Sequence, residues 1–133
     1  MPDALSAVRY LLANNAGVTA EVAAARIMAG VIPQGTALPA IGISHVSTVR
    51  REVVKGGESK FNTTRVQITV HAATYPKQRS VLRLVRAALP RSRGTVSGTA
   101  VDAIVTDLEG PDFRDDEAGI FMGTQDYIVT WTE

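Results

Sequence analysis

The sequence predicts an α+β domain in which a single antiparallel (mixed) sheet of about four to five strands carries two main helices packed on one face. The first observation is a change of periodicity within residues 64–89. Apolar residues initially recur at every second position, as in a half-buried strand: Val66, Ile68, Val70 and Ala72. They then follow a helical spacing: Val81, Leu82, Val85, Ala88 and Leu89. The second observation is the order of elements along the chain, which runs helix, strand, strand, helix, strand, strand.

The N-terminal segment begins with a short amphipathic helix over residues 4–14. Asp3 is placed to cap this helix, and Asn14-Asn15-Ala16-Gly17 is typical of a stop. We expect a helical turn at residues 22–26 and an extended stretch at 27–32, which Pro33 ends.

A strand is predicted over residues 40–50, after the turn-forming residues 33–39. The spacing of Val46 and Val49 indicates a twist or bulge late in this strand. Residues 52–62 contain Lys55-Gly56-Gly57-Glu58 and fit a long hairpin connection. The connection exceeds a two-residue turn, so we expect a long hairpin arm at about residues 50–63.

The C-terminal third is predicted to contain two further strands. Residues 103–107 form the first, and residues 120–131 form the last. Between them, residues 108–119 hold Pro111, two glycines and a cluster of five acidic residues, so we expect a loop there.

Length and composition limit the class of protein. The chain has 133 residues, so we expect a single domain spanning 1–133. Its net charge of +1 provides no global attraction to nucleic acid or membrane, and the absence of cysteine excludes disulfides and thiolate chemistry. No signal peptide or membrane-spanning run is present in the sequence, which predicts a soluble, cytoplasmic protein.

Candidate catalytic and metal-binding residues are few. His45 and His71 are the only histidines, and they lie 26 positions apart without metal-ligand spacing. The serines lack the context of a nucleophile elbow, and the glycines form no phosphate-binding motif. We therefore expect no catalytic residue, no cofactor and no metal, and a protein that is not an enzyme.

Two clusters of opposite charge stand out. The basic residues, which we interpret as contacts to a neighbouring subunit or another protein, are Arg50, Arg51, Lys55, Lys60, Arg65, Arg79, Arg83 and Arg86. The acidic residues of the predicted loop are Asp107, Glu109, Asp112, Asp115, Asp116 and Glu117. These clusters are compatible with three roles: contact with nucleic acid, a solvated loop, or an interface with another protein. Copies could also associate head to tail, with basic residues of one against acidic residues of the next.

The order and spacing of these segments resemble a known family. The relevant segments are Pro33-Gln-Gly-Thr-Ala-Leu-Pro-Ala-Ile-Gly-Ile-Ser44, a variable arm, Thr64-Arg-Val-Gln-Ile-Thr-Val-His-Ala72, and a helix ending Val85-Arg-Ala-Ala-Leu89. Over about residues 5–131 they are similar to the tail-completion proteins of long-tailed bacteriophages, also called tail terminators or tail-to-head joining proteins. The family carries a larger residue at the position of Ala40, and its pattern lacks the acidic stretch 109–117.

The resemblance implies a structural virion protein made in the host cytoplasm. Its subunits would form a hexameric ring at the head-proximal end of the tail tube, stop tube polymerisation and meet the head connector. The partners implied are further copies of the chain, the tail tube protein and a connector or neck protein, with DNA only passing through the channel. The acidic residues would face either the channel or the connector. A neck or head-closure protein and a small ligand-binding regulatory domain are the alternatives.

Overall fold

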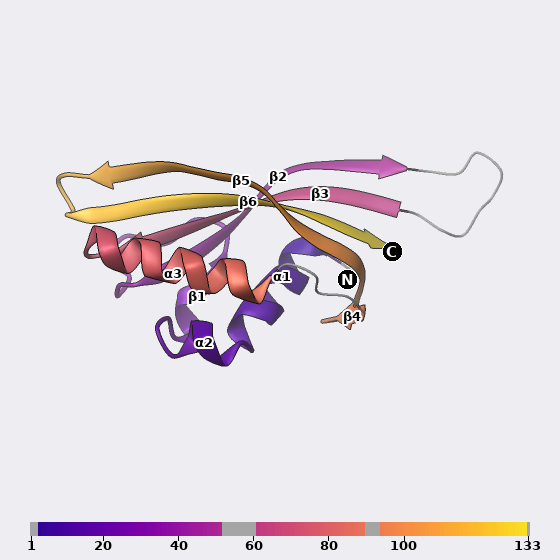
Figure 1. Ribbon diagram of the computed structural model, residues 1–133, viewed down its shortest axis with the longest axis horizontal. Coiled ribbons are helices and arrows are strands. Elements are labelled where there is room, and N and C mark those ends of the chain that lie inside the picture. Colours follow the sequence, from indigo (N-terminus) through magenta and orange to yellow (C-terminus); the bar gives the residue numbers. More distant parts are fainter. Residues whose placement is uncertain (1–2, 52–60, 90–93, 133) are drawn as a thin grey trace.

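The computed structural model describes residues 3–51, 61–89 and 94–132 and shows an α+β architecture (Figure 1). The helices are α1 (Ala4–Ala13), α2 (Ala16–Thr19) and α3 (Tyr75–Ala88), with a 3₁₀ turn at Ala24–Arg26. The strands are β1 (Ile27–Ala29), β2 (Ala40–Arg51), β3 (Phe61–Ala72), β4 (Gly94–Val96), β5 (Thr99–Asp115) and β6 (Ile120–Thr132).

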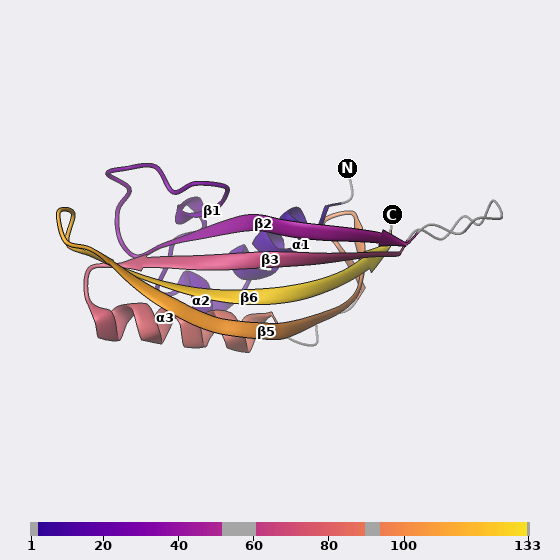
Figure 2. The same cartoon turned by 90° about the horizontal axis from the view of Figure 1, so that it is seen from above.

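All described strands belong to one sheet in the order β1-β2-β3-β6-β5-β4. The sheet is mixed, because β1 pairs with β2 in parallel while every other pair is antiparallel. The helices lie against one face of the long, twisted sheet, and no helix of the described residues lies on the opposite face (Figures 1 and 2). The predicted class is therefore confirmed. The strand number was too low because β1 and β4 span only three residues each, too few to show a period.

The N-terminal helices follow from their capping residues. The Asp3 side chain accepts a hydrogen bond from the backbone N–H of Leu5, as expected of an N-cap. Asn15, by contrast, does not simply end α1. Its Oδ1 accepts from the N–H of Val18 at 3.1 Å and so starts α2, which includes the predicted stop residue Gly17. An asparagine suits both the end and the start of a helix, which is why the sequence pattern was ambiguous.

The hairpin of β2 and β3 is confirmed, including the irregularity at Val46. The register runs from Ala40 opposite His71 to Arg51 opposite Phe61, with a shift between His45 and Ser47 that leaves Val46 as a bulge. The predicted arm lies mostly at residues 52–60, outside the described residues, together with Lys55 and Lys60.

The predicted loop over residues 108–119 is wrong. Strand β5 continues to Asp115, and only residues 116–119 form the turn into β6. Gly110 and Pro111 are accommodated by a register shift between Glu109 and Asp112. Proline is tolerated there because β5 is bonded to β6 on one side only at this point, so no described strand needs the missing N–H.

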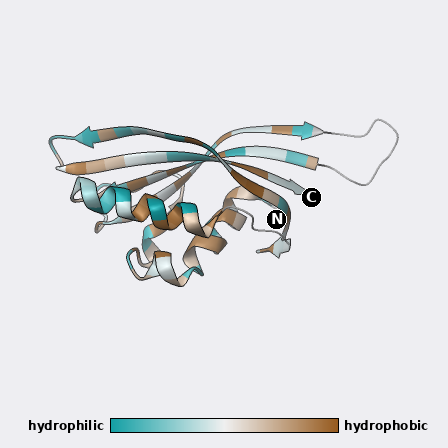
Figure 3. Cartoon of the chain, viewed as in Figure 1, coloured by the Kyte–Doolittle hydropathy of each residue, from teal (hydrophilic) through white to brown (hydrophobic). Residues whose placement is uncertain are grey.

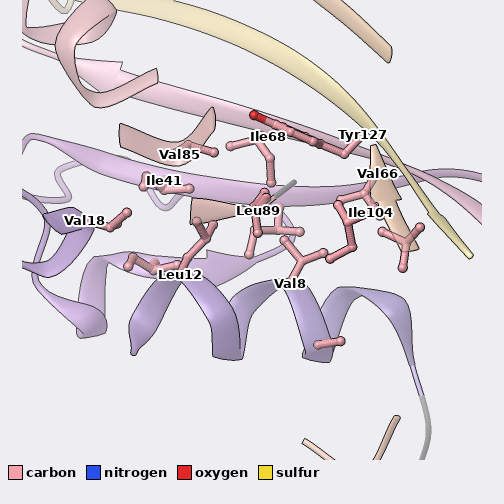
Figure 4. Close-up of a cluster of buried hydrophobic side chains, with 14 of the residues drawn as sticks. Val8, Leu12, Val18, Ile41, Val66, Ile68, Val85, Leu89, Ile104 and Tyr127 are labelled. Atoms are coloured by element: carbon pink, nitrogen blue, oxygen red, sulfur yellow. The ribbon is translucent and has the colours of Figure 1, made fainter. Parts of the chain in front are cut away.

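The core lies between the helices and the covered face of the sheet (Figure 4). Along β3 every second side chain from Asn62 to Ala72 is buried, which confirms the strand period. Val8 and Leu12 of α1, Val85 of α3 and Leu89 directly after α3 are fully buried against this face. The Trp131 Nε1–H donates to Thr64 Oγ1 at 2.9 Å, which satisfies two polar groups inside the core.

Helix α3 packs very closely against the sheet at Gly123 of β6. A Cβ there would lie 2.4 Å from Gln78 Nε2 and 2.7 Å from Leu82 Cδ1. Gln78 and Leu82 of α3 are buried, at 0% and 2% exposure, and have little room to move away. The missing side chain of Gly123 therefore sets how closely α3 approaches the sheet.

We predict that Gly123→Ala lowers the free energy of unfolding by about 1–3 kcal/mol, because the added methyl group overpacks the contact between α3 and β6. Urea denaturation measures the change. Gly42→Ala is the matched control in β2, since a Cβ there meets Ile32 Cγ1 at 3.0 Å and should cost less. Equal effects of the two substitutions would contradict the assignment of Gly123 as the limiting contact.

Candidate functional site

The centre of the uncovered sheet face holds a cluster of charged and polar side chains around Arg65 of β3. Its guanidinium pairs with Asp107 of β5, and its Nη1 lies 3.4 Å from Asp126 Oδ2 of β6. Gln67 Nε2 donates to Asp126 Oδ1 at 3.2 Å. The hydrogen bond to Asp107 raises the pKa of Arg65 above its ordinary value, so the cation is permanent. The cluster links three strands across the open face.

A second set of contacts joins α3 to the far half of β5. Arg86 Nη1 lies 2.7 Å from Glu109 Oε1. Asp112 accepts hydrogen bonds from Tyr75 Oη at 2.9 Å and from Gln78 Nε2 at 3.2 Å. The bond to Asp112 raises the pKa of Tyr75, which remains a neutral donor. Members of the predicted basic and acidic sets therefore meet within one chain.

The turn between β5 and β6 forms one end of the molecule, and β5 is hydrophilic as it approaches this turn (Figures 1 and 3). Asp115 Oδ1 accepts from the N–H groups of Glu117 and Ala118, at 3.1 and 3.2 Å. Asp116 Oδ1 lies 3.1 Å from Arg114 Nε. Half of the predicted acidic set, Asp115, Asp116 and Glu117, is thus gathered at this exposed tip.

The remaining predicted basic residues are distributed over two other regions. Arg50 and Arg51 end β2, at the opposite end of the sheet from the β5–β6 turn. Arg79 and Arg83 are exposed on α3, and neither forms an ion pair with any residue that the structure describes. With Arg86, Gln125 and Glu109 they line a small hollow of about 60 Å³. The basic set is therefore not one continuous patch.

A larger groove of about 690 Å³ lies between the segment after β1 and the β5–β6 turn. Its apolar lining includes Ile32, Leu38 and Ile120, and its polar lining includes His71 and Asp115. Burial lowers the pKa of His71 below its ordinary value, which favours the neutral imidazole.

No catalytic arrangement is found in the described part of the chain. His45 Nε2 lies 2.7 Å from Thr48 Oγ1 on exposed β2, whereas His71 is at the other end of the β2–β3 pairing. Among the described residues no group of three His, Cys, Asp or Glu side chains could hold a metal ion. No described helix is long and apolar enough to cross a bilayer.

Tyr75 and Gln78 contact Asp112, and neither is among the site residues predicted from the sequence. The signal for Gln78 was its position, because it continues the apolar stripe of α3 one turn before Val81 and Leu82. A polar residue on an apolar stripe indicates a buried hydrogen bond. Tyr75 offered no such signal, because it opens the helix at an exposed position.

The sequence matches the family described as "Tail completion protein gp17" over residues 6–132. This match spans nearly every element of the fold. The chain belongs to the tail completion family. Membership gives it a structural role in a phage tail and agrees with the resemblance found in the sequence.

A solved structure shares the fold of this family member. It is a chain of the "Virion of native gene transfer agent (GTA) particle", with a TM-score of 0.72 and 14% sequence identity. The alignment covers 98% of the present chain and 95% of that chain, so the likeness includes the whole fold. No curated protein matches the sequence.

We predict that the free energy of unfolding of this tail completion protein falls as the pH drops below about 6.5, the ordinary pKa of histidine. Because the folded state lowers the pKa of His71, the unfolded chain binds the proton more tightly and is favoured by acid. Urea denaturation between pH 7.5 and 5.5 should show this slope, and His71→Gln should reduce it. His45→Gln is the matched control; an equal reduction in that variant would contradict the role of His71.

Proposed function

We propose that the chain is the tail terminator of a phage or prophage particle. Six copies form a ring at the head-proximal end of the tail tube, stop tube polymerisation and join the tail to the head connector. The protein is made in the host cytoplasm and becomes part of the virion. It acts by binding other proteins and catalyses no reaction.

The observation that carries this proposal is the family match over residues 6–132. The geometry supports it, because the β2–β3 hairpin and the β5–β6 hairpin extend to opposite ends of the sheet (Figure 2). One end carries Arg50 and Arg51, and the other carries Asp115, Asp116 and Glu117. A subunit with chemically different ends can bind a different partner at each, as a joint between tube and connector requires.

The charged residues take their roles within this proposal. The tube or a neighbouring subunit is contacted by two groups of basic residues. The first group lies at and beyond the end of β2 in the sequence and comprises Arg50, Arg51, Lys55 and Lys60. The second group is Arg79 and Arg83 on α3. The acidic tip at residues 115–117 faces the connector or the channel. In the channel its negative charge repels the DNA backbone, so passing DNA does not stick. Arg65 and Arg86 instead hold Asp107 and Glu109 of their own chain.

Two alternatives are separated by experiment. A neck or head-closure protein would bind the same junction without acting on tube length. The groove of about 690 Å³ favours the other alternative, a small ligand-binding domain, because its size is in the usual range for such sites. Its lining mixes Gln34, Thr36 and Asp115 with apolar residues at an open surface, however, and no convergent set of polar groups fixes a ligand.

We predict that adding this protein to polymerising tail tube protein of the same particle stops elongation and places a six-fold ring at one end of each tube. Negative-stain electron microscopy measures both tube length and end structure. The control is tube protein alone, which should continue to elongate. Tubes that grow equally long with the protein present and carry no rings would contradict the terminator function, and rings without any effect on length would favour the neck protein.

We predict that the double substitution of Arg79 and Arg83 by Glu weakens ring assembly on the tube, because it reverses two exposed charges of α3. The loss should be larger at low salt, where screening is weaker. Sedimentation of the protein with preformed tubes at two salt concentrations measures it. Unchanged co-sedimentation at physiological salt would exclude these two residues from the interface.

A further inference from the structure

The two outermost long strands each leave most of one edge unpaired. Strand β1 covers β2 only at residues 41–43, and β4 covers β5 only at residues 99–101. No described strand pairs with the outer edge of β2 over residues 44–51 or with that of β5 over residues 102–115. Each edge presents backbone N–H and C=O groups that another strand can bind.

The strand directions allow one copy to continue the sheet of the next. The long strands follow the order β2, β3, β6 and β5, and each is antiparallel to the next, so β2 and β5 run in opposite directions. When copies are placed side by side in the same orientation, β5 of one therefore runs antiparallel to β2 of the next. The repeat continues without reversing any copy, as a heterologous ring requires.

Exposed apolar side chains lie along both free edges. On β2, Val49 is 60% exposed, and on β5, Val105 is 53% exposed. Val49 is opposite Thr63 and Val105 is opposite Ile128, which places both valines on the face without helices. Val46 on β2 and Leu108 on β5 are exposed as well. Natural proteins rarely leave such edges open, so these residues indicate a partner strand.

The two edges are matched in regular length. Bulges flank residues 103–106 of β5, and residues 47–51 of β2 follow the bulge at Val46, so each edge offers one short regular stretch. With Val49 opposite Val105, antiparallel pairing places Arg50 opposite Ile104 and Arg51 opposite Ala103. Two β5 edges would instead juxtapose carboxylates, which disfavours a two-fold contact.

We propose that residues 47–51 of β2 in one copy pair antiparallel with residues 103–106 of β5 in the next, joining the sheets into a closed band around the ring. The partner is a second copy of this chain. The inference rests on the proposed ring and adds which strands form its subunit contacts.

Cysteine crosslinking tests the pairing, since the chain contains no cysteine of its own. Double variants combine Ser47→Cys or Val49→Cys with Ala103→Cys or Val105→Cys. Within one chain these positions are separated by three strand spacings, about 14 Å, which is too far for a disulfide. Any disulfide must therefore join two copies. Oxidised samples assembled on tail tube should give a ladder of crosslinked species up to the hexamer on denaturing gels without reductant, and reductant should abolish it.

Single-cysteine variants and a Val49→Cys, Tyr10→Cys pair are the controls, because Tyr10 is exposed on α1, on the covered side of the sheet. They should give no species above the dimer. If no double variant forms a ladder in samples whose images show rings, the edge pairing is overturned and the terminator function stands. Efficient dimers of Val105→Cys alone would show a two-fold β5 contact and overturn the pairing too. If tubes elongate without rings, both the ring and the pairing fail.

A second measurement separates assembly from folding. Val105→Lys places a charge on the β5 edge at an exposed position, so the isolated protein should keep its urea midpoint. We expect the number of ringed tube ends to fall at least tenfold, and Tyr10→Lys, the matched control, to leave it unchanged. Normal ring formation by Val105→Lys would overturn the pairing.

Discussion

The fold depends on the close approach of α3 to β6. At Gly123 the helix and the strand backbone meet without an intervening side chain, and Gln78 and Leu82 fill the contact. This close contact places the apolar side chains of Val85 and Leu89 against the covered face of β3 and against α1. Because the described helices all pack against one face, the other face and the outer edges remain for other contacts. The position of the core therefore decides which face and which edges of the sheet stay exposed.

Periodicity was sufficient to predict the elements whose burial alternates regularly. Strand β3 and helix α3 were predicted from their apolar spacing, and β2 was predicted with its irregularity at Val46. Strand β5 was missed beyond Asp107, because over residues 108–115 it carries Gly110, Pro111 and three acids and buries no side chain. What makes that stretch a strand is its pairing with β6, a partner distant from the local sequence pattern.

The charge clusters were found in the sequence, but their partners depend on the register. Arg65 and Asp107 are 42 residues apart, and they meet because β3, β6 and β5 are neighbours in the sheet. Arg86 meets Glu109 because α3 crosses the same region. Composition alone could not distinguish pairs within a chain from pairs between chains. The exposed pairs contribute little to stability in water, and they reduce the charge available for contacts between copies.

The opposite placement of the two hairpins gives the subunit a direction along its strands. A cyclic assembly of such subunits inherits a polar axis, with unlike upper and lower surfaces. A ring of this kind that binds a tube through one surface offers the incoming tube subunit a surface of different chemistry. In the proposed terminator role, tube growth would then end for lack of a matching template, without a separate blocking device. The different chemistry of the two ends of one sheet would thus be enough to fix the length of the tail.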